Sequence, residues 1–358
     1  MTVYVIGGGI AGCEAAYQLA ERGISVVLYE MRPKMQYGAH QSGLLAEIVA
    51  LQGGVSYFDD PFNPYLQTPL QRQLSHELIM HQSKMMTLIQ TYRLNENKGF
   101  CYDIKRVTHA MHQAIITNPC ITIKRVRLTQ LPPGPTILAT GPNTDVSLLD
   151  HVGVCYEKQS QPEIVVDVQC DFVALDDKQL QRLITFLRCA QCVPLLPHEK
   201  DIDTTHTLEH YAHQGTESFI EHVLIKHKTG YVWPIRSNGA LQNSCTRLVW
   251  SKQRAMMKII FPMKPVVIRR YGVVHRNTYL LEVGPHLNLL NREDCFAVGQ
   301  IAGMDGYLEA IASGFYVGAT MPVAGKDNRT GLYTNTLIET CIKNRVEAKL
   351  ASLPYNWR

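Results

Sequence analysis

The sequence has no apolar run of the roughly 18 residues that a membrane-spanning helix needs, and it has no fixed-period repeat or low-complexity tract. Its ten cysteines are scattered over 358 residues, without the dense framework of a small secreted domain. The first thirty residues have the pattern of a strand, a helix and a second strand, not of a signal peptide. We therefore expect reduced thiols, a cytoplasmic location and no membrane partner. With 358 residues, 46% of them hydrophobic, the chain is long enough to form two domains with buried cores.

Acidic residues are absent from His222 to Leu281, although the whole chain has 31 of them. The basic residues of this stretch are Lys226, Lys228, Arg236, Arg247, Lys252, Arg254, Lys258, Lys264, Arg269, Arg270 and Arg276. Because the net charge of the whole chain is only +4, the rest of the chain is net negative. One basic block on an otherwise acidic protein is typical of a surface that binds a polyanion such as RNA, and a solvated basic face is the alternative.

A glycine-rich turn near the N-terminus has the spacing of a dinucleotide-binding site. Residues 2–6 are a short apolar run that predicts a buried parallel strand, and Gly7, Gly9 and Gly12 follow it with the G-x-G-x-x-G spacing. A helix is predicted from Ala11 to about Arg22, then a C-capping Gly23, then a second strand over 24–29. Glu30 ends this strand at the place where an acidic side chain binds ribose hydroxyls. The turn and the helix N-terminus would bind a diphosphate.

Two later segments favour FAD over NAD as the tightly bound cofactor. Residues 136–141 form an apolar strand that ends in Ala-Thr-Gly, and residues 295–299 form another that ends in Gly. A helical stretch rich in small residues, 307–319, comes after Gly303. The two strands resemble the second and third sequence motifs of flavoproteins with two dinucleotide-binding domains. In those proteins the last helix points its N-terminus at the flavin.

Longer motifs resemble one family of flavoproteins. Residues 5–16 (VIGGGIAGCEAA) resemble the opening of two tRNA-uridine modification families, the folate-dependent tRNA uracil-5-methyltransferases (TrmFO) and the MnmG family. Residues 29–33 (YEMRP) and 46–49 (AEIV) are similar to the first of these. Residues 270–279 (RYGVVHRNTY) and 298–310 (VGQIAGMDGYLEA) resemble two further signatures of the methyltransferase family. The resemblance spans nearly the whole chain.

This resemblance implies FAD as cofactor, methylenetetrahydrofolate as one-carbon donor, NADH or NADPH as reductant, and tRNA or another RNA as partner. The implied reaction is one-carbon transfer to carbon 5 of a uracil in the T-loop of tRNA. The candidate cofactor-binding residues are Gly7, Gly9, Gly12, Glu30, Arg32, Thr140, Gly141, Gly299, Gln300 and Gly303. The candidate substrate-binding residues are His275, Arg276, Asn277, Arg247, Lys252 and Arg254. Trp233, Tyr231 and Trp250 are candidates to stack on a base or a pterin, or to lie in the core.

The chain departs from the family at both catalytic cysteines. The resemblance places the first cysteine at Ala50 and the second at Ala174, and alanine can neither add to uracil nor move a proton. Cys170, Cys101 and Cys13 are the other thiols considered, each with a buried hydrophobic role as the alternative. The Cys189–Cys192 pair lacks a second pair at zinc spacing, so we expect no metal, and a redox pair stays open. The catalytic residues are therefore left unassigned, and a flavoprotein that has lost methyl transfer is the alternative function.

The predicted fold class is α/β. Residues 1–148 and 266–335 are predicted to form a doubly wound, Rossmann-like FAD-binding domain. Residues 149–265 are predicted to form a smaller inserted α+β domain that binds substrate or RNA, and residues 336–358 a C-terminal tail. The oligomeric state is not predicted.

Overall fold

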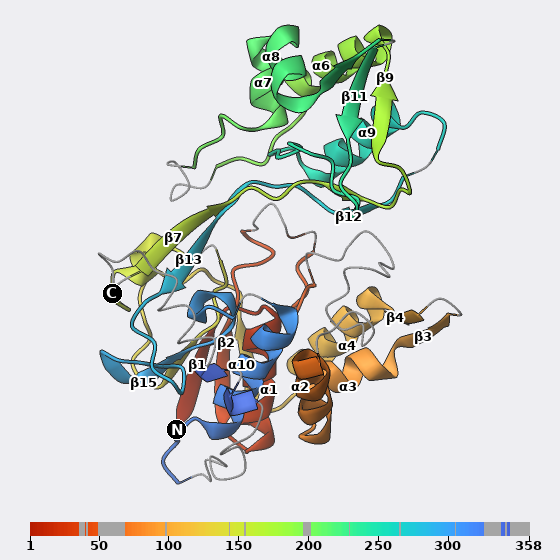
Figure 1. Cartoon of the computed structure of the whole chain (residues 1–358). Coiled ribbons are helices and arrows are strands. Elements are labelled where there is room, and N and C mark those ends of the chain that lie inside the picture. Colours follow the sequence, from red (N-terminus) through yellow and green to blue (C-terminus); the bar gives the residue numbers. More distant parts are fainter. Residues whose placement is uncertain are drawn as a thin grey trace. The chain divides into compact units, whose positions relative to one another are not determined.

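The computed structural model describes residues 1–35, 40, 42–48, 69–96, 99–142, 144–153, 155–195, 202–228, 230–264, 266–304, 306–325, 338–340 and 342–343. These residues form two compact units (Figure 1). The first unit contains the described residues of Met1–Ile48, Val55–Lys158 and Asn277–Arg358, and the second those of Gln159–Arg276. None of the helices in these ranges has the length and apolar character that crossing a bilayer requires.

The first unit is built on a six-stranded sheet with the order β14-β15-β6-β1-β2-β5. Its strands are β1 (Thr2–Ile6), β2 (Ser25–Tyr29), β5 (Ile121–Lys124), β6 (Thr136–Leu138), β14 (Asn288–Leu289) and β15 (Arg292–Ala297). All neighbouring strands are parallel except β14 and β15. The chain builds from β1 through β2 to β5, and then returns to β6 on the other side of β1. The strand order therefore reverses between β1 and β6, the position at which α/β sheets of this kind bind ligands.

The helices of the first unit are α1 (Ile10–Glu21), α2 (Pro69–Met80), α3 (Lys84–Thr91), α4 (Ile104–Ile116), α5 (Val146–Leu149) and α10 (Tyr307–Thr320), with a 3-10 helix η2 (Gly299–Ala302). A small hairpin joins β3 (Arg93–Glu96) and β4 (Gly99–Tyr102). Helices α1 and α10 pack backbone against backbone, because a Cβ at Gly314 would lie 2.2 Å from the Ala11 carbonyl oxygen. Arg22 joins their far ends by donating to the carbonyls of Gly318 and Met321, at 2.8 and 2.9 Å.

The second unit has a three-stranded antiparallel sheet with the order β10-β11-β9. Its elements are β8 (Val165–Val166), β9 (Phe172–Leu175), α6 (Asp177–Cys189), α7 (Leu208–Gln214), α8 (Thr216–Val223), β10 (Ile225–His227), β11 (Gly230–Pro234), α9 (Trp250–Ile260) and β12 (Ile268–Arg270). The hydrophobic core includes Leu183 of α6, Phe219 of α8 and Met256 of α9. Trp233 is fully buried in it, and its indole N–H donates to the Gln242 carbonyl at 2.8 Å.

The chain passes between the units within two paired strands, β7 (Cys155–Ser160) and β13 (His275–Leu280). The boundaries between the two described units therefore lie after Lys158 and before Asn277, whereas the predicted domain boundaries lie at 149 and 265. The prediction of an α/β fold with a parallel, Rossmann-like sheet is confirmed. The first predicted strand, helix and second strand match β1, α1 and β2 to within one residue at each end, and Gly23 follows α1 with a left-handed φ of 66°.

Candidate nucleotide-binding site

Three segments that are far apart in the sequence meet at the carboxyl ends of β1, β6 and β15. The Ala139 amide donates to the Ile6 carbonyl at 2.8 Å, and the Val298 amide donates to the Leu138 carbonyl at 2.8 Å. These parallel ladders bring the Gly7–Gly9 turn, Thr140 and Gly141, and Gly299 and Gln300 to one edge of the sheet. The three sequence marks of the predicted cofactor site therefore lie at the switch point.

The glycines of the first turn serve two different purposes. A Cβ at Gly12 would lie 2.0 Å from the Gly7 carbonyl oxygen, and a Cβ at Gly7, whose φ is 108°, would lie 2.2 Å from the Ala139 carbonyl oxygen. A side chain at either position would collide with backbone atoms, so the tight turn between β1 and α1 requires glycine at both. Gly9 has an ordinary φ of −74°, and no described atom lies within 4 Å of its Cβ position. Nothing in the described fold requires glycine at Gly9, so the open space beside it fits a ligand that approaches the backbone.

The N-terminus of α1 begins directly at this open position. Gly9 is its N-cap residue, with no side-chain capping hydrogen bond, and the first turn has no acidic residue. Within the described residues, neither the N-cap nor the first turn of α1 supplies an acidic side chain to the free N–H groups and the positive end of the helix dipole; the nearby Glu30 carboxylate accepts from the Gly8 amide, one residue before the N-cap. Together with the space at Gly9, this arrangement fits a diphosphate.

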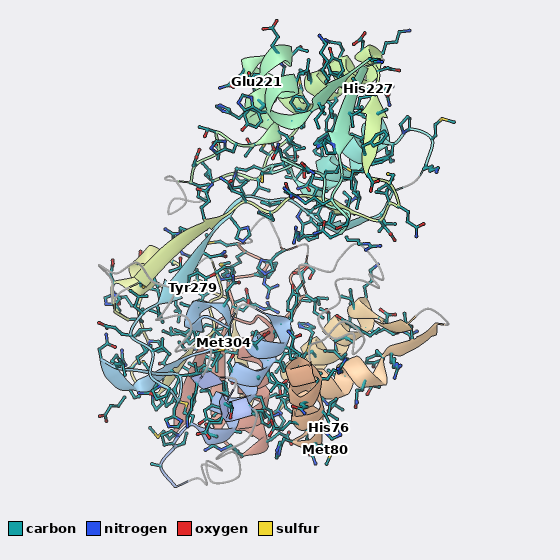
Figure 2. The ribbon with its side chains drawn as sticks, viewed as in Figure 1. His76, Met80, Glu221, His227, Tyr279 and Met304 are labelled. Carbon is teal, nitrogen blue, oxygen red and sulfur yellow. The ribbon has the colours of Figure 1, made fainter. Side chains whose placement is uncertain are left out.

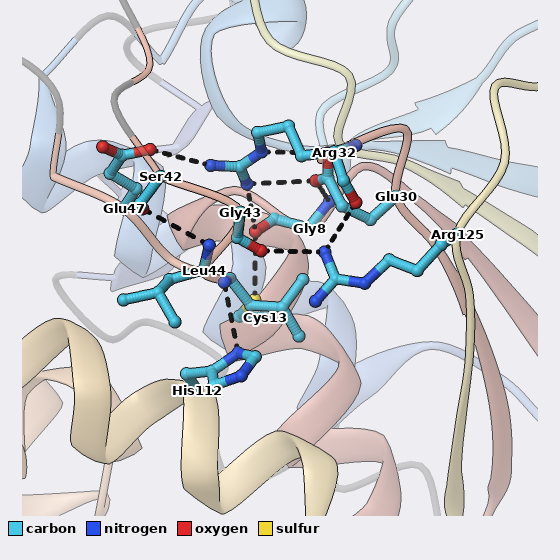
Figure 3. Close-up of polar contacts among 11 residues, drawn as sticks. Gly8, Cys13, Glu30, Arg32, Ser42, Gly43, Leu44, Glu47, His112 and Arg125 are labelled. Atoms are coloured by element: carbon cyan, nitrogen blue, oxygen red, sulfur yellow. Dashed lines mark hydrogen bonds and ion pairs between the residues drawn. The ribbon is translucent and has the colours of Figure 1, made fainter. Parts of the chain in front are cut away.

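Glu30 and Arg32 form a buried ion pair beside the turn (Figure 3). The Glu30 carboxylate accepts hydrogen bonds from the Gly8 amide at 2.8 Å, and from the amide, Nε and Nη2 of Arg32 at 2.9, 2.9 and 3.1 Å. Burial alone would raise the pKa of Glu30, but the hydrogen bonds and charge of Arg32 outweigh it and the pKa is lowered. A carboxylate has about four acceptor positions. A ribose hydroxyl that donates to Glu30 would therefore replace one of the Arg32 donors.

The Arg32 guanidinium also joins the turn to the segment that follows β2. Its side chain is almost fully buried, and Nη1 donates to Glu47 Oε2 at 3.1 Å while Nη2 donates to the Gly8 carbonyl at 3.1 Å. The same carbonyl accepts from the Ala46 amide at 2.9 Å. Arg125, on the stretch after β5, donates to the carbonyls of Arg32 and Gly43 at 2.9 and 3.1 Å. Glu47 and Arg125 were not predicted as site residues, because only tertiary pairing brings them to the turn.

Cys13, one of the thiols considered from the sequence, is fully buried in this network. Its Sγ donates to the Gly8 carbonyl at 3.3 Å (Figure 3). Burial raises the pKa of the Cys13 thiol to about 12. Since the thiolate is the nucleophile, Cys13 is a packing residue at neutral pH.

The segments after β6 and β15 supply polar side chains on the other side of the turn. Gln300, in η2, donates from Nε2 to Asn277 Oδ1 at 3.1 Å, and Asn277 is buried. Thr140 and Thr144 share a hydrogen bond of 2.5 Å between their hydroxyls. Gly303 ends η2 with a left-handed φ of 86°. These residues lie at the same edge of the sheet as the glycine turn.

The remaining substrate candidates are dispersed over the second unit. His275 Nδ1 lies 2.8 Å from the Val273 carbonyl, and both His275 and Arg276 are half-buried. Arg247 is buried, and its guanidinium donates to the carbonyls of Val193, Pro194 and Val274 at 3.0 to 3.3 Å. Arg247 was predicted to be a substrate-binding residue, but these contacts give it an internal role. Lys252 and Arg254 lie on the outward side of α9.

The predicted aromatic stacking residues are mostly in the core. Trp233 is fully buried, and Trp250 is buried and stacks on Tyr271 with a centroid distance of 4.1 Å and an interplanar angle of 4°. Tyr231, in β11, is half-buried. Trp233 therefore has no face for a base or pterin, and one face of Trp250 is already occupied by Tyr271.

The structure describes only one of the two alanines that the resemblance aligns with the family's cysteines. Ala50 lies outside the described residues. Ala174 is an exposed residue of β9, paired with Val232 of β11. Cys170, Cys189 and Cys192 are free cysteines whose residues are exposed overall. The Cys192 sulfur itself is partly desolvated and lies 3.7 Å from Glu209 Oε1, and together these effects raise its pKa to about 12. Cys101 lies in β4. Within the described ranges, no three His, Cys, Asp or Glu side chains are grouped to hold a metal ion.

The strand order, the switch point and the glycine turn define a dinucleotide-binding protein of the α/β class. The sequence matches the family described as Glucose inhibited division protein A over residues 2–161 and 235–327, and the chain belongs to this family. Proteins of this family bind FAD.

Individual relatives carry a more specific name. The chain is 29% identical to the methylenetetrahydrofolate–tRNA-(uracil-5-)-methyltransferase TrmFO of Bacillus subtilis (strain 168), over 88% of this chain and 81% of that protein. It is also 29% identical to the protein of the same name from Anoxybacillus flavithermus, over 91% of this chain and 84% of that protein. A crystal structure of Aquifex aeolicus GidA aligns with 99% of this chain and 74% of its own, at 14% identity and a TM-score of 0.47.

Proposed function

We propose that this chain is an FAD- and methylenetetrahydrofolate-dependent methyltransferase-like protein that acts on carbon 5 of a uracil in tRNA. Membership of an FAD-binding family and the names of the 29%-identical relatives support the proposal. The observation that carries it is the open position at Gly9, next to an uncapped helix N-terminus at the switch point. A protein that used this fold only as a scaffold would have no need of glycine there.

Different residues around the switch point would bind different parts of FAD. The amides at the start of α1 would bind the diphosphate, and Gly9 would let it approach. Glu30 and Arg32 would meet the adenosine ribose, and Gln300, held by Asn277, would lie toward the flavin. When bound, FAD supplies the reducing chemistry that converts a methylene unit to a methyl group, with NADH or NADPH as the source of electrons. The buried Glu30–Arg32–Glu47 network would keep the turn in one geometry.

The two alanines support a second candidate, a diverged flavoprotein that acts as an oxidoreductase or RNA-binding protein without methyl transfer. The family's route needs a thiolate that adds to uracil, and Ala174 offers only a methyl group on an exposed strand. Cys13 is too deeply buried, with a pKa of about 12, to replace the missing thiolate. Cys170 is exposed and four residues from Ala174, so it is the substitute thiol to test.

The two candidates are separated by one labelling experiment. Protein loaded with FAD is incubated with NADPH or NADH, carbon-labelled methylenetetrahydrofolate and a tRNA transcript that lacks the T-loop methyl group. Label on C5 of uracil supports the methyltransferase, and Cys170→Ser should then abolish it if Cys170 is the substitute. The absence of label from an FAD-loaded, RNA-binding protein supports the diverged flavoprotein. The double variant Ala50→Cys and Ala174→Cys is the matched gain-of-function control.

A further inference from the structure

Helix α9 has an outward face whose charges the fold leaves unbalanced. Its inward face is formed by Trp250, Gln253, Met256, Met257 and Ile260. Its outward side bears Lys252, Arg254 and Lys258, of which Arg254 and Lys258 are exposed and Lys252 is half-buried. No acidic residue occurs in the helix or anywhere from His222 to Leu281. We refer to Lys252, Arg254 and Lys258 as the α9 basic face.

Lys252 and the Arg254–Lys258 pair are placed unfavourably for the helix, although the helix dipole favours Lys258 itself in the last turn. Arg254 and Lys258 are four residues apart, so they are like-charged neighbours on one face. Lys252 lies in the first turn, where the helix dipole favours an acidic residue, and the Val249 N-cap makes no side-chain capping bond. An acidic residue in place of Lys252 would be favoured by the helix dipole.

Three other arginines of the second unit have partners within the protein. Arg236 pairs with Glu163 at 3.1 Å, and Arg269 pairs with Asp167. Arg247 is buried among three carbonyls. By contrast, neither Lys252 nor Lys258 has an ion pair or hydrogen bond in the described structure, and Arg254 contacts only the hydroxyl and ring of Tyr271. These three arginines have partners within the fold, whereas the α9 cations, like the exposed Lys226 and Lys228, face outward.

We infer that the α9 basic face is the surface by which this protein binds the phosphate backbone of its RNA. This inference rests on the proposed function, which supplies an RNA partner, and adds the surface and the mode of contact. Flexible cations on an acid-free helical face match a line of phosphates, and they read charge and spacing instead of base identity. Binding should therefore depend strongly on salt and weakly on sequence.

The test compares two triple variants with the same change in net charge. The first is Lys252→Gln, Arg254→Gln and Lys258→Gln. The control is Lys226→Gln, Lys228→Gln and Lys105→Gln, which removes the same number of exposed positive charges away from α9. Lys226 and Lys228 flank His227, which Figure 2 shows at the far end of the second unit from its β12 strand, and Lys105 lies in α4. The Kd for an unmodified tRNA transcript and for a scrambled transcript is measured against salt concentration, and FAD binding is measured on every variant.

The α9 variant should bind both transcripts roughly 10- to 100-fold more weakly near 0.15 M salt, and the slope of log K against log salt should fall by about 2 to 3. The control should stay within about threefold of wild type at this salt. The thermal midpoint of the α9 variant should be unchanged or higher, because like charges have been removed. The charge-conserving variant Lys252→Arg, Arg254→Lys and Lys258→Arg should bind as wild type does.

Equal binding by the α9 variant and the control would overturn the inference while leaving the proposed function intact. If FAD-loaded wild type bound neither transcript, the RNA component of the proposed function would fail as well. Anionic vesicles and an acidic polypeptide are assayed in parallel. Loss of binding to either of these, with RNA binding unchanged, would assign the α9 basic face to a different partner and also overturn the inference.

Discussion

At the scale of single residues, Gly9 and Gly12 look alike in the sequence but are required for different reasons. Gly12 is in contact with the Gly7 carbonyl and with Ala139, so its lack of a side chain serves the fold. Gly9 has no described neighbour at its Cβ position, so under the proposed function its lack of a side chain admits the ligand. The distinction rests on backbone geometry that the G-x-G-x-x-G spacing alone does not contain.

This distinction predicts opposite phenotypes for two alanine variants. Gly9→Ala should change the free energy of unfolding by less than about 1 kcal/mol, because its φ is ordinary and only the N-cap is altered. Its affinity for FAD should fall at least tenfold, since the new methyl group occupies the approach to the diphosphate. Gly12→Ala should lower the free energy of unfolding by about 1–3 kcal/mol, because the added methyl group overpacks the turn. Urea unfolding and FAD fluorescence titration measure the two effects, and a Gly9→Ala protein with wild-type FAD affinity would contradict the assignment.

Arg32 gives a prediction about pH. The lowered pKa of Glu30 means that its pairing stabilises the fold above the unfolded-state pKa, near 4.5, and that this contribution is lost as pH falls through the folded pKa. In Arg32→Gln, burial of Glu30 without its partner would raise the pKa of that carboxyl instead. We expect a loss of about 3–5 kcal/mol at pH 7, as for other broken buried pairs. The loss should shrink as pH falls from 7 toward 5, because Glu30 can then take up a proton.

The control for this prediction is Arg106→Gln. Arg106 pairs with Asp103 at 3.5 Å on the surface of α4, and its side chain is 72% exposed. Its removal should cost less than about 1 kcal/mol and show little pH dependence between 5 and 7. Denaturant unfolding of both variants at the two pH values makes the comparison. A penalty for Arg32→Gln that is constant with pH would rule out Glu30 as the group left uncompensated.

At the scale of elements, the contact between α1 and α10 fixes the two helices that flank the switch point. A Cβ at Gly314 would lie 2.2 Å from a backbone oxygen of Ala11, and one at Gly318 would lie 2.7 Å from that of Ala15. Backbone atoms cannot rotate away as a side chain can, so α10 would have to shift.

Gly314→Ala is therefore expected to destabilise the protein by about 1–3 kcal/mol. This sign is opposite to that of helix propensity, since replacing glycine by alanine inside a helix normally stabilises it by up to about 1 kcal/mol. FAD affinity should fall with it, because Gly299 at the site is held by the Ser313 hydroxyl of α10, 2.9 Å from its amide. Thermal unfolding with and without FAD measures both effects, and a more stable variant would contradict the packing account.

The same scale shows which parts of the fold were predictable. The β1–α1–β2 unit follows from local signals, a buried apolar run, a glycine turn and a helical repeat within thirty residues, and it was predicted closely. The strand pair β7 and β13 was not, because its polar strands lie more than a hundred residues apart and carry no local signal. The unit boundaries fall within these strands.

The candidate site divides in the same way. The glycines and Glu30 were found because spacing along the chain defines them. Glu47 and Arg125 were missed because their roles depend on the buried position of Arg32. Arg247 was named a candidate substrate-binding residue within the acid-free basic stretch, whereas the structure uses its charge to bind three carbonyls inside the second unit. Charge in a sequence does not distinguish a cation that serves the fold from one that faces a partner.

At the scale of the whole molecule, the protein combines a cofactor unit with a unit that bears an unbalanced basic helix. The glycine at position 9 and the basic face of α9 are supported in the same way. In each case the residue present does not stabilise the described fold. Glycine at Gly9 and like charges on α9 are each explained by a partner outside the chain. The alanines that the resemblance aligns with the family's cysteines bear only on the chemistry between the proposed partners, so the proposed binding of FAD and RNA does not depend on whether the protein transfers a methyl group.

The most direct test of this account is an equilibrium titration of the purified, unliganded protein with FAD, followed by flavin fluorescence and absorbance. We predict one FAD bound per chain, a yellow complex and a higher thermal midpoint in its presence. A folded protein that binds no FAD at saturating concentration would contradict the assignment of the Gly7–Gly12 turn to a flavin nucleotide.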